Sequence, residues 1–248
     1  FGRWAGVVGA YNGLRALGLR SGRYELVPAH RCTDLGHLKS QLVRVDPGNV
    51  RIAVTGGGRV AGGATEILDA AGIARSDPPD YLSRGFNHAV YTRLDPWHYT
   101  RHGEGIPFDF DHFVAHPAKY VNNFFPYAAR TDLYMACHFW DPRSPFLLTR
   151  EDLKNPAIPI RIIADISCDI GGPIASTIRA STIEEPFYGY DPFTGKETQP
   201  FQPDAITVMA VDNLPGELPR DASEDFGEAL SASVVPELLG KEAGGMLE

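Results

Sequence analysis

The chain has 248 residues, 43% of them hydrophobic and 22% charged, which is enough to bury a substantial core in one large domain or slightly more. Its net charge of −8 argues against the basic face that nucleic acids require, and no apolar run reaches the length of a membrane span. Three scattered cysteines are too few for a disulfide framework, so we expect a soluble, cytoplasmic protein without a nucleic-acid or membrane partner.

The first predicted element is an amphipathic helix over Gly2–Leu19. Its glycines each weaken it by about 1 kcal/mol relative to alanine, so it should form only where another element packs closely against them. Because the chain opens at Phe1 on what reads as protein interior, we expect an N-terminal portion to precede it and assign residues 1–20 as an interdomain helix. A second helix is predicted near Asp34–Leu42.

A strand, a glycine turn and a helix follow in that order, as at the start of a β-α-β unit. Arg51–Thr55 is a short β-branched run, the turn starts at Gly56, and Ala61–Ala71 has helical spacing. Gly56, Gly58 and Ala61 match the dinucleotide fingerprint G-x-G-x-x-G/A in its required context.

Each position of this fingerprint has a physical role. Gly56 permits the tight turn, and Gly58 lets a pyrophosphate approach the backbone. The helix that begins near Arg59 and Val60 offers free N–H groups and a positive dipole end to the phosphates. Gly62 and Gly63 are expected to let this helix sit close to the strand. The alternative is a plain strand-to-helix turn without a ligand.

A carboxylate that binds the ribose is expected at the end of the second strand, about 20 residues on. Asp77 lies 21 positions after Gly56 and follows the short run Ile73–Ser76. A carboxylate there favours NAD, whereas the neighbouring Arg75 could hold a 2′-phosphate, so the cofactor is NAD or NADP.

The later segments complete an α/β fold, a Rossmann-like parallel sheet with helices on both faces. Ala89–Leu94 is predicted as an extra edge strand, and the remaining strands are Thr131–Trp140 in the centre, Arg161–Ser167 and Ala205–Val211. We assign residues 21–220 to the dinucleotide-binding domain and 221–248 to a helix over Asp221–Leu239 with a frayed tail. The terminal helices belong to, or bridge to, a preceding catalytic domain.

Polar side chains at the ends of these strands are the candidate site residues, because ligands of open α/β sheets bind outside the carboxyl ends of the strands. The strongest is Asp212, followed by Asn213; Asp165, Ser167 and Asp169 share one face if their strand stays regular. His138 could lie over the adenine or ribose. Each candidate also has a structural interpretation. Asp212 could be a turn aspartate, one of the three residues Asp165, Ser167 and Asp169 could be a buried turn former, and His138 could be a core histidine.

Two histidine pairs show the spacing of metal ligands on a helix, but neighbouring prolines and glycines argue against such helices. These pairs are His98 with His102 and His112 with His116. No convincing third ligand accompanies them, so we expect no metal site. Arg179 and Arg220 are candidate partners for a substrate carboxylate, or simply members of structural ion pairs.

Four motifs resemble the saccharopine dehydrogenase and lysine–2-oxoglutarate reductase family, which has the two-domain fold of the alanine dehydrogenase and transhydrogenase type. They are FGRWAG (1–6), DISCDIGGP (165–173), STIEEPFYGYD (181–191) and DNLPGELPRDAS (212–223). The resemblance implies that the protein reversibly joins L-lysine and 2-oxoglutarate to give saccharopine, with hydride transfer, and that Asp212 lies near the nicotinamide and substrate.

In this family an acid–base Lys/His pair lies upstream of the FGRWAG motif, and this sequence does not contain it. This chain is therefore expected to bind a dinucleotide but to lack its principal acid–base residues. The resemblance implies a small amino-acid or 2-oxo-acid substrate, and a homodimer is possible. The alternatives are a non-catalytic dinucleotide-binding module and an alanine dehydrogenase-like enzyme.

Overall fold

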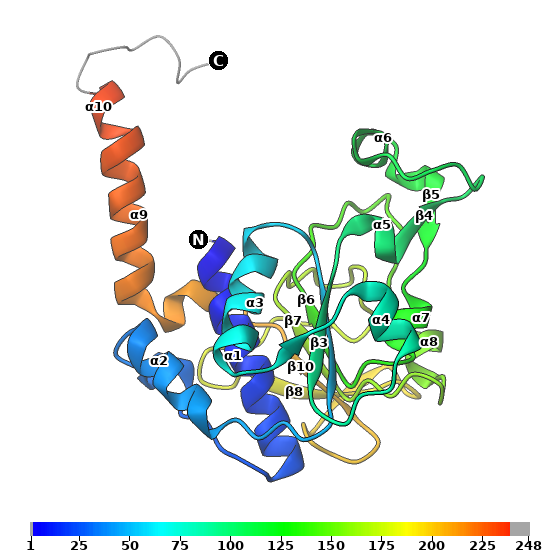
Figure 1. Ribbon diagram of the computed structural model, residues 1–248, viewed down its shortest axis with the longest axis horizontal. Coiled ribbons are helices and arrows are strands. Elements are labelled where there is room, and N and C mark those ends of the chain that lie inside the picture. The colour runs from blue at the N-terminus through cyan, green and yellow to red at the C-terminus, as the bar shows by residue number, and fades with distance from the viewer. Residues whose placement is uncertain (1, 239–248) are drawn as a thin grey trace.

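The computed structural model describes residues 2–238, which fold around one eight-stranded sheet and a small two-stranded sheet (Figure 1). The strands are β1 (Arg51–Thr55), β2 (Ala74–Arg75), β3 (Val90–Leu94), β4 (Thr100–His102), β5 (Tyr120–Asn122), β6 (Leu133–Ala136), β7 (Ile162–Asp165), β8 (Phe187–Asp191), β9 (Lys196–Thr198) and β10 (Ile206–Met209). The α-helices are α1 (Gly2–Ser21), α2 (Leu35–Gln41), α3 (Arg59–Ala70), α4 (Pro78–Ser83), α5 (Pro96–Tyr99), α6 (Phe110–Ala115), α7 (Phe125–Ala128), α8 (Arg150–Lys154), α9 (Pro219–Ser233) and α10 (Val235–Leu238). The 3-10 helices are η1 (Ala29–Arg31), η2 (Leu42–Arg44), η3 (Pro117–Lys119) and η4 (Leu214–Glu217).

The large sheet has the order β2-β3-β1-β6-β7-β10-β8-β9, and its first six strands are parallel. The predicted α/β, Rossmann-like class is therefore confirmed. The hairpin β8-β9 adds two antiparallel strands beside β10, which the sequence analysis missed. The predicted edge position of Ala89–Leu94 is wrong, because β3 pairs with β1 on one side and with β2 on the other.

Helices cover both faces of this sheet. Along β1, Ile52 and Val54 join the core under α1 and α3, whereas Ala53 joins the core on the opposite face, where α4, α7 and α8 lie (Figure 1). This alternation follows from the two-residue period of a strand. All three side chains are fully buried, so the central strands are apolar on both faces.

The glycines of α1 are where other elements approach it. A Cβ at Gly6 would overlap the backbone of Val60 in α3, and one at Gly9 would overlap the side chain of Ile166. The predicted close packing is therefore confirmed. The predicted amphipathic character is wrong, however, since buried residues lie on most sides of the helix and it is covered by other elements there. It packs on the sheet as part of the same body, so a role as a bridge to another domain stays a prediction.

The prediction that Gly62 and Gly63 bring α3 close to the strand is wrong. A Cβ at Gly63 would overlap the carbonyl oxygen of Arg3 in α1, and a Cβ at Gly62 would meet nothing within 4 Å. Gly6 and Gly63 therefore act together, since each removes a side chain from the α1–α3 contact. Gly63 thus serves helix–helix packing.

Two segments project from the body. Residues 96–122 form an excursion between β3 and β6 that carries α5, α6 and the β4-β5 hairpin (Figure 1). The C-terminal helix α9 begins at Pro219 and extends away from the sheet, with Ala222 as its buried residue (Figure 1). The predicted end of this helix at Leu239 and the tail after it lie outside the described residues. Among residues 2–238, no helix is long and apolar enough to cross a membrane.

Candidate functional site

A cavity of about 780 Å³ opens at the carboxyl ends of β1 and β6. Strands β2 and β3, which come directly after β1 in the chain, lie on one side of β1, whereas β6, β7 and β10 lie on its other side. The strand order therefore reverses between β1 and β6. Ligands of open α/β sheets bind at such a point. The cavity also has the size expected of a small-molecule or cofactor site.

The glycine turn after β1 forms the floor of this cavity. Gly56 has φ +112°, which L side chains rarely adopt, and a Cβ on it would lie 2.5 Å from the carbonyl oxygen of Cys137. Gly58 has extended backbone angles, and the position of its missing Cβ is open space. The first glycine is thus required by the fold, whereas the second leaves room above the backbone for another molecule.

Helix α3 begins directly at this turn. Its N-cap residue is Gly58, so no side chain caps the first N–H groups, and Arg59 and Val60 line the cavity beside it. Ala61 is buried beneath them in the core. Uncapped N–H groups and the positive end of the helix dipole suit an anion such as a pyrophosphate.

The carboxylate at the glycine turn is Asp95, at the end of β3, and the expectation for Asp77 is not met. Asp77 is exposed at the start of α4, after β2, and β3 separates β2 from β1. Asp95 lines the cavity, and a Cβ on Gly57 would overlap its Oδ1. A carboxylate at the end of β2 would reach the turn only if β2 paired with β1, but β3 takes that place.

His138 is a buried histidine with one free nitrogen at the cavity. It is 5% exposed, and its Nδ1 lies 2.8 Å from Thr55 Oγ1, which lies 2.9 Å from the hydroxyl of Tyr134. Its Nε2 is buried and has no hydrogen-bond partner among the described residues. Burial lowers the pKa of this imidazole to about 4, so the ring is neutral at pH 7. Unsatisfied buried nitrogens are uncommon and therefore point to a polar ligand.

The turn after β7 divides Asp165, Ser167 and Asp169 between two roles, because the strand ends at Asp165. Ser167 and Asp169 line the cavity. Asp165 is 1% exposed and accepts hydrogen bonds from Thr177 Oγ1 at 2.6 Å and the Cys168 N–H at 3.0 Å. The prediction of one shared face is wrong, because Cys168 takes the left-handed conformation and ends the alternation. Asp165 is the buried turn former, and burial raises its pKa to about 6.

Asp212 and Asn213 are exposed in the turn between β10 and η4, and neither is among the described residues that line the cavity. Asp212 lies near Cys168, whose thiol pKa is raised to about 11 by burial and by the nearby charges of Asp165, Asp212 and Asp169. Asp212 is therefore at the same edge of the sheet as Asp169, outside the cavity wall. Its assigned part near the nicotinamide stays a prediction.

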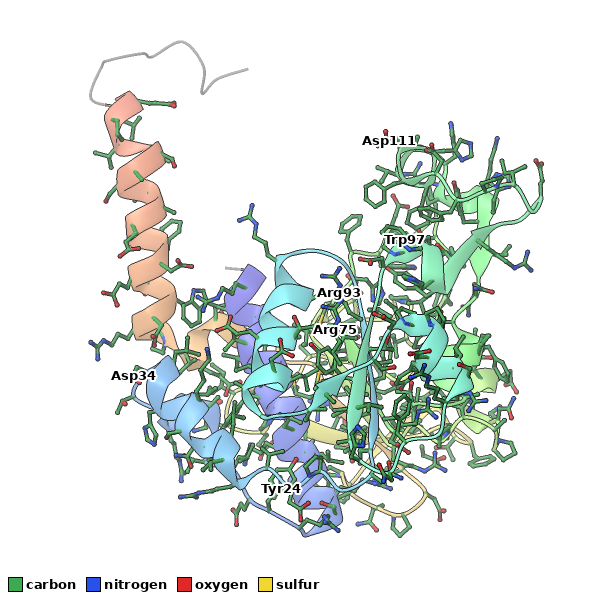
Figure 2. The ribbon with its side chains drawn as sticks, in the orientation of Figure 1. Tyr24, Asp34, Arg75, Arg93, Trp97 and Asp111 are labelled. Atoms are coloured by element: carbon green, nitrogen blue, oxygen red, sulfur yellow. The ribbon has the colours of Figure 1, made fainter. Side chains whose placement is uncertain are left out.

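The excursion after β3 supplies an apolar wall that the sequence analysis did not anticipate. Trp97, Phe110, Phe113 and Val114 line the cavity, and Trp97 is 51% exposed at the base of the excursion (Figure 2). The clustering of aromatics between residues 97 and 113 was the available signal. Such a wall suits the flat faces of a nicotinamide or adenine ring.

The histidine pairs and two arginines have structural partners. His102, His112 and Tyr120 stack inside the excursion, and no group of described residues could hold a metal ion. Arg179 forms a bidentate ion pair with Glu197, so it is a member of a structural ion pair. The Nη1 of Arg220 lies 4.0 Å from Asp34 Oδ2 on the surface.

Comparisons with known proteins agree with this fold and with the sequence motifs. The mitochondrial alpha-aminoadipic semialdehyde synthase of Bos taurus is 29% identical over 278 residues, which covers 93% of this chain and 29% of that protein. The L-lysine-forming, NAD(+)-type saccharopine dehydrogenase of Emericella nidulans is 28% identical over 107 residues, which covers 42% of this chain and 27% of that protein. This chain is related to the saccharopine dehydrogenases. The resemblance inferred from its motifs is thereby confirmed.

A solved L-alanine dehydrogenase matches the structure with a TM-score of 0.52 at 15% identity, covering 97% of this chain and 54% of that one. At this identity the match concerns the fold alone, and it supports the Rossmann-like assignment. No family model matches the chain. The chain spans less than a third of the length of the two curated relatives described here.

Proposed function

We propose that this chain is the dinucleotide-binding part of an oxidoreductase of the saccharopine dehydrogenase type, which interconverts saccharopine with L-lysine and 2-oxoglutarate. The observation that carries the proposal is the glycine turn: positive φ at Gly56, open space over Gly58 and an uncapped α3 meet at the point where the strand order reverses. These features fit a pyrophosphate, because they offer backbone donors and no side chain in the way.

The remaining lining residues fit the other parts of a nicotinamide dinucleotide. Asp95 is placed to accept hydrogen bonds from ribose hydroxyls, as a carboxylate at the end of the strand beside β1 does in this fold. The free Nε2 of His138 and the hydroxyl of Ser167 lie on the β6–β7 side, where a second ribose or the carboxamide would need polar partners. The bound dinucleotide supplies the hydride donor or acceptor.

Within this chain, the residues that line the cavity bind and orient the cofactor, and the apolar side chains of the excursion cover one side of it. His138 stays neutral at pH 7, so its Nε2 can act as a hydrogen-bond partner without adding a charge beside the ring. We assign Asp169 and Asp212 to the substrate side of the site, because Asp169 follows β7 and Asp212 follows the neighbouring β10 at the carboxyl edge of the sheet.

The test has a binding arm and an activity arm. Isothermal titration of NAD+ and NADP+ into this chain should give saturable binding of at least one; no binding of either would refute the cofactor assignment. The full-length protein that contains this chain should also oxidise NADH or NADPH when lysine and 2-oxoglutarate are both present. Oxidation with pyruvate and ammonia instead would assign the chain to an alanine dehydrogenase-like enzyme. Binding by this chain without any turnover by the full-length protein would favour a non-catalytic module.

A further inference from the structure

The two ring nitrogens of His138 have different surroundings. Nδ1 lies 2.8 Å from Thr55 Oγ1, whereas Nε2 is buried and has no partner among the described residues. The side chain lines the cavity, and burial keeps its ring neutral at pH 7. A neutral imidazole carries one proton, so the tautomer decides whether Nε2 donates or accepts a hydrogen bond at the cavity.

Two hydroxyl groups behind Nδ1 determine which nitrogen carries this proton. Thr55 and Tyr134 are fully buried, and their hydroxyl oxygens lie 2.9 Å apart. Within residues 2–238, Thr55 Oγ1 is the one acceptor in reach of the Tyr134 hydroxyl, so Tyr134 donates to Thr55. The proton of Thr55 then has Nδ1 of His138 as its acceptor. Nδ1 therefore accepts, and the ring proton is on Nε2.

The opposite tautomer would leave a buried proton unmatched. If Nδ1 donated to Thr55, either Thr55 or Tyr134 would keep a hydroxyl proton for which the described residues offer no acceptor. An unmatched buried donor should reduce the population of that arrangement by about tenfold or more. Nε2 has no protein partner in either tautomer, so it does not alter this balance.

Two further contacts hold His138 in this orientation. Ser167 Oγ donates a hydrogen bond to the carbonyl oxygen of His138 at 2.6 Å, and the centroid of the Tyr99 ring lies 5.8 Å from that of the imidazole. A half-turn of the imidazole would put a carbon atom beside Thr55 and take away the acceptor of the Thr55 proton. Nε2 is therefore the nitrogen that is left for a ligand.

We propose that Thr55, oriented by Tyr134, is a positioning residue that fixes His138 as a neutral hydrogen-bond donor, so that His138 binds an oxygen acceptor of the ligand in the cavity. The inference rests on the proposed function for the presence of that ligand and specifies what His138 does to it. A carbonyl oxygen suits a neutral donor, and both a carboxamide and a 2-oxo acid carry one. A nitrogen that already holds its proton cannot act as a general base, so His138 does not replace the acid–base pair of the family.

Nitrogen NMR of the chain with 15N-labelled histidine reads the tautomer. The signals of His138, one of eight histidines, are identified by their loss in His138→Met. We expect a single tautomer with the proton on Nε2 between about pH 5 and 8, because the pKa is about 4. Thr55→Val, which removes the hydroxyl, should give a mixture of tautomers, and Thr55→Ser should keep the single one. Thr92→Val removes an unpartnered hydroxyl from a fully buried threonine of β3 and is the matched control, which should change nothing.

The outcomes separate this inference from the proposed function. A proton on Nδ1 in the wild type, or an unchanged single tautomer in Thr55→Val, would overturn the inference. Neither measurement needs a ligand, so failure of NAD+ and NADP+ to bind would refute the proposed function alone.

Where a dinucleotide binds, Nε2 should keep its proton, and the signal of that proton should move downfield. Movement on addition of the dinucleotide alone assigns the oxygen acceptor to the cofactor, and movement only after 2-oxoglutarate is added assigns it to the substrate. Loss of the Nε2 proton in the complex, or no movement with either ligand, would overturn the donor role.

Discussion

Replacement of Gly58 by alanine tests the cofactor cradle, because the protein itself has room for the added methyl group. Gly58 has φ −91° and ψ −165°, which alanine adopts readily, and nothing lies within 4 Å of the Cβ position. The thermal midpoint should therefore stay near that of the wild type. In the complex, the methyl group would stand where the pyrophosphate approaches the α3 N–H groups. Loss of one hydrogen bond to a charged group costs about 1.5–3 kcal/mol, which corresponds to about a 10- to 100-fold weaker dinucleotide affinity.

Two neighbouring glycines give the controls for this experiment. Gly62→Ala also meets open space, but one turn further into α3, so it should bind the dinucleotide normally and stabilise the helix by about 1 kcal/mol. Gly56→Ala should destabilise the fold by about 1–3 kcal/mol, because its φ of +112° is strained for alanine. Titration calorimetry and thermal unfolding separate the two effects. Wild-type affinity in a folded Gly58→Ala variant would refute the cradle.

Three further predictions follow from particular contacts. Asp95→Asn should weaken binding of NAD+ by about tenfold, whereas Asp77→Asn should leave it unchanged; equal effects in titration would restore the original expectation for Asp77. Glu217 is 1% exposed and accepts a hydrogen bond from Asn12 at 2.8 Å, and burial raises its pKa from 4.5 to about 7. The fold therefore favours the protonated form, and the wild type loses stability as pH rises from 4.5 through 7. In urea titrations, Glu217→Gln should match the wild type near pH 4 and exceed it by up to about 3 kcal/mol at pH 8; a constant difference would contradict the assignment. Gly6→Val should lower the thermal midpoint sharply, since its side chain would overlap α3, and an unchanged midpoint would mean that the α1–α3 contact is dispensable.

The elements with a strong local signal were predictable from the sequence. Strand β1 was placed at Arg51–Thr55 with both ends correct, because its apolar run stops at the glycine turn. The core ranges of β6, β7 and β10 were also found, although each predicted strand extended past the observed ends. The hairpin β8-β9 was missed because its sequence is rich in aromatic, charged and turn residues and has no clean apolar alternation.

The errors at the site came from pairings between distant segments. Asp77 was chosen by its distance along the chain from Gly56, but β2 lies at the edge of the sheet and Asp95 follows the strand that contacts β1. Asp165 was grouped with Ser167 and Asp169 on the assumption of a strand that continues, and the left-handed Cys168 ends it.

The sequence by itself determined the strand–glycine–helix unit, because the backbone freedom of Gly56 and the N–H groups of α3 are local properties of consecutive residues. It also determined that α1 needs close packing, since its glycines leave it too weak to form alone. Only the tertiary structure decided which carboxylate faces the turn and which aromatic side chains line the cavity. Those choices depend on strand order, and strand order is fixed by burial across the whole sheet, which no single segment encodes.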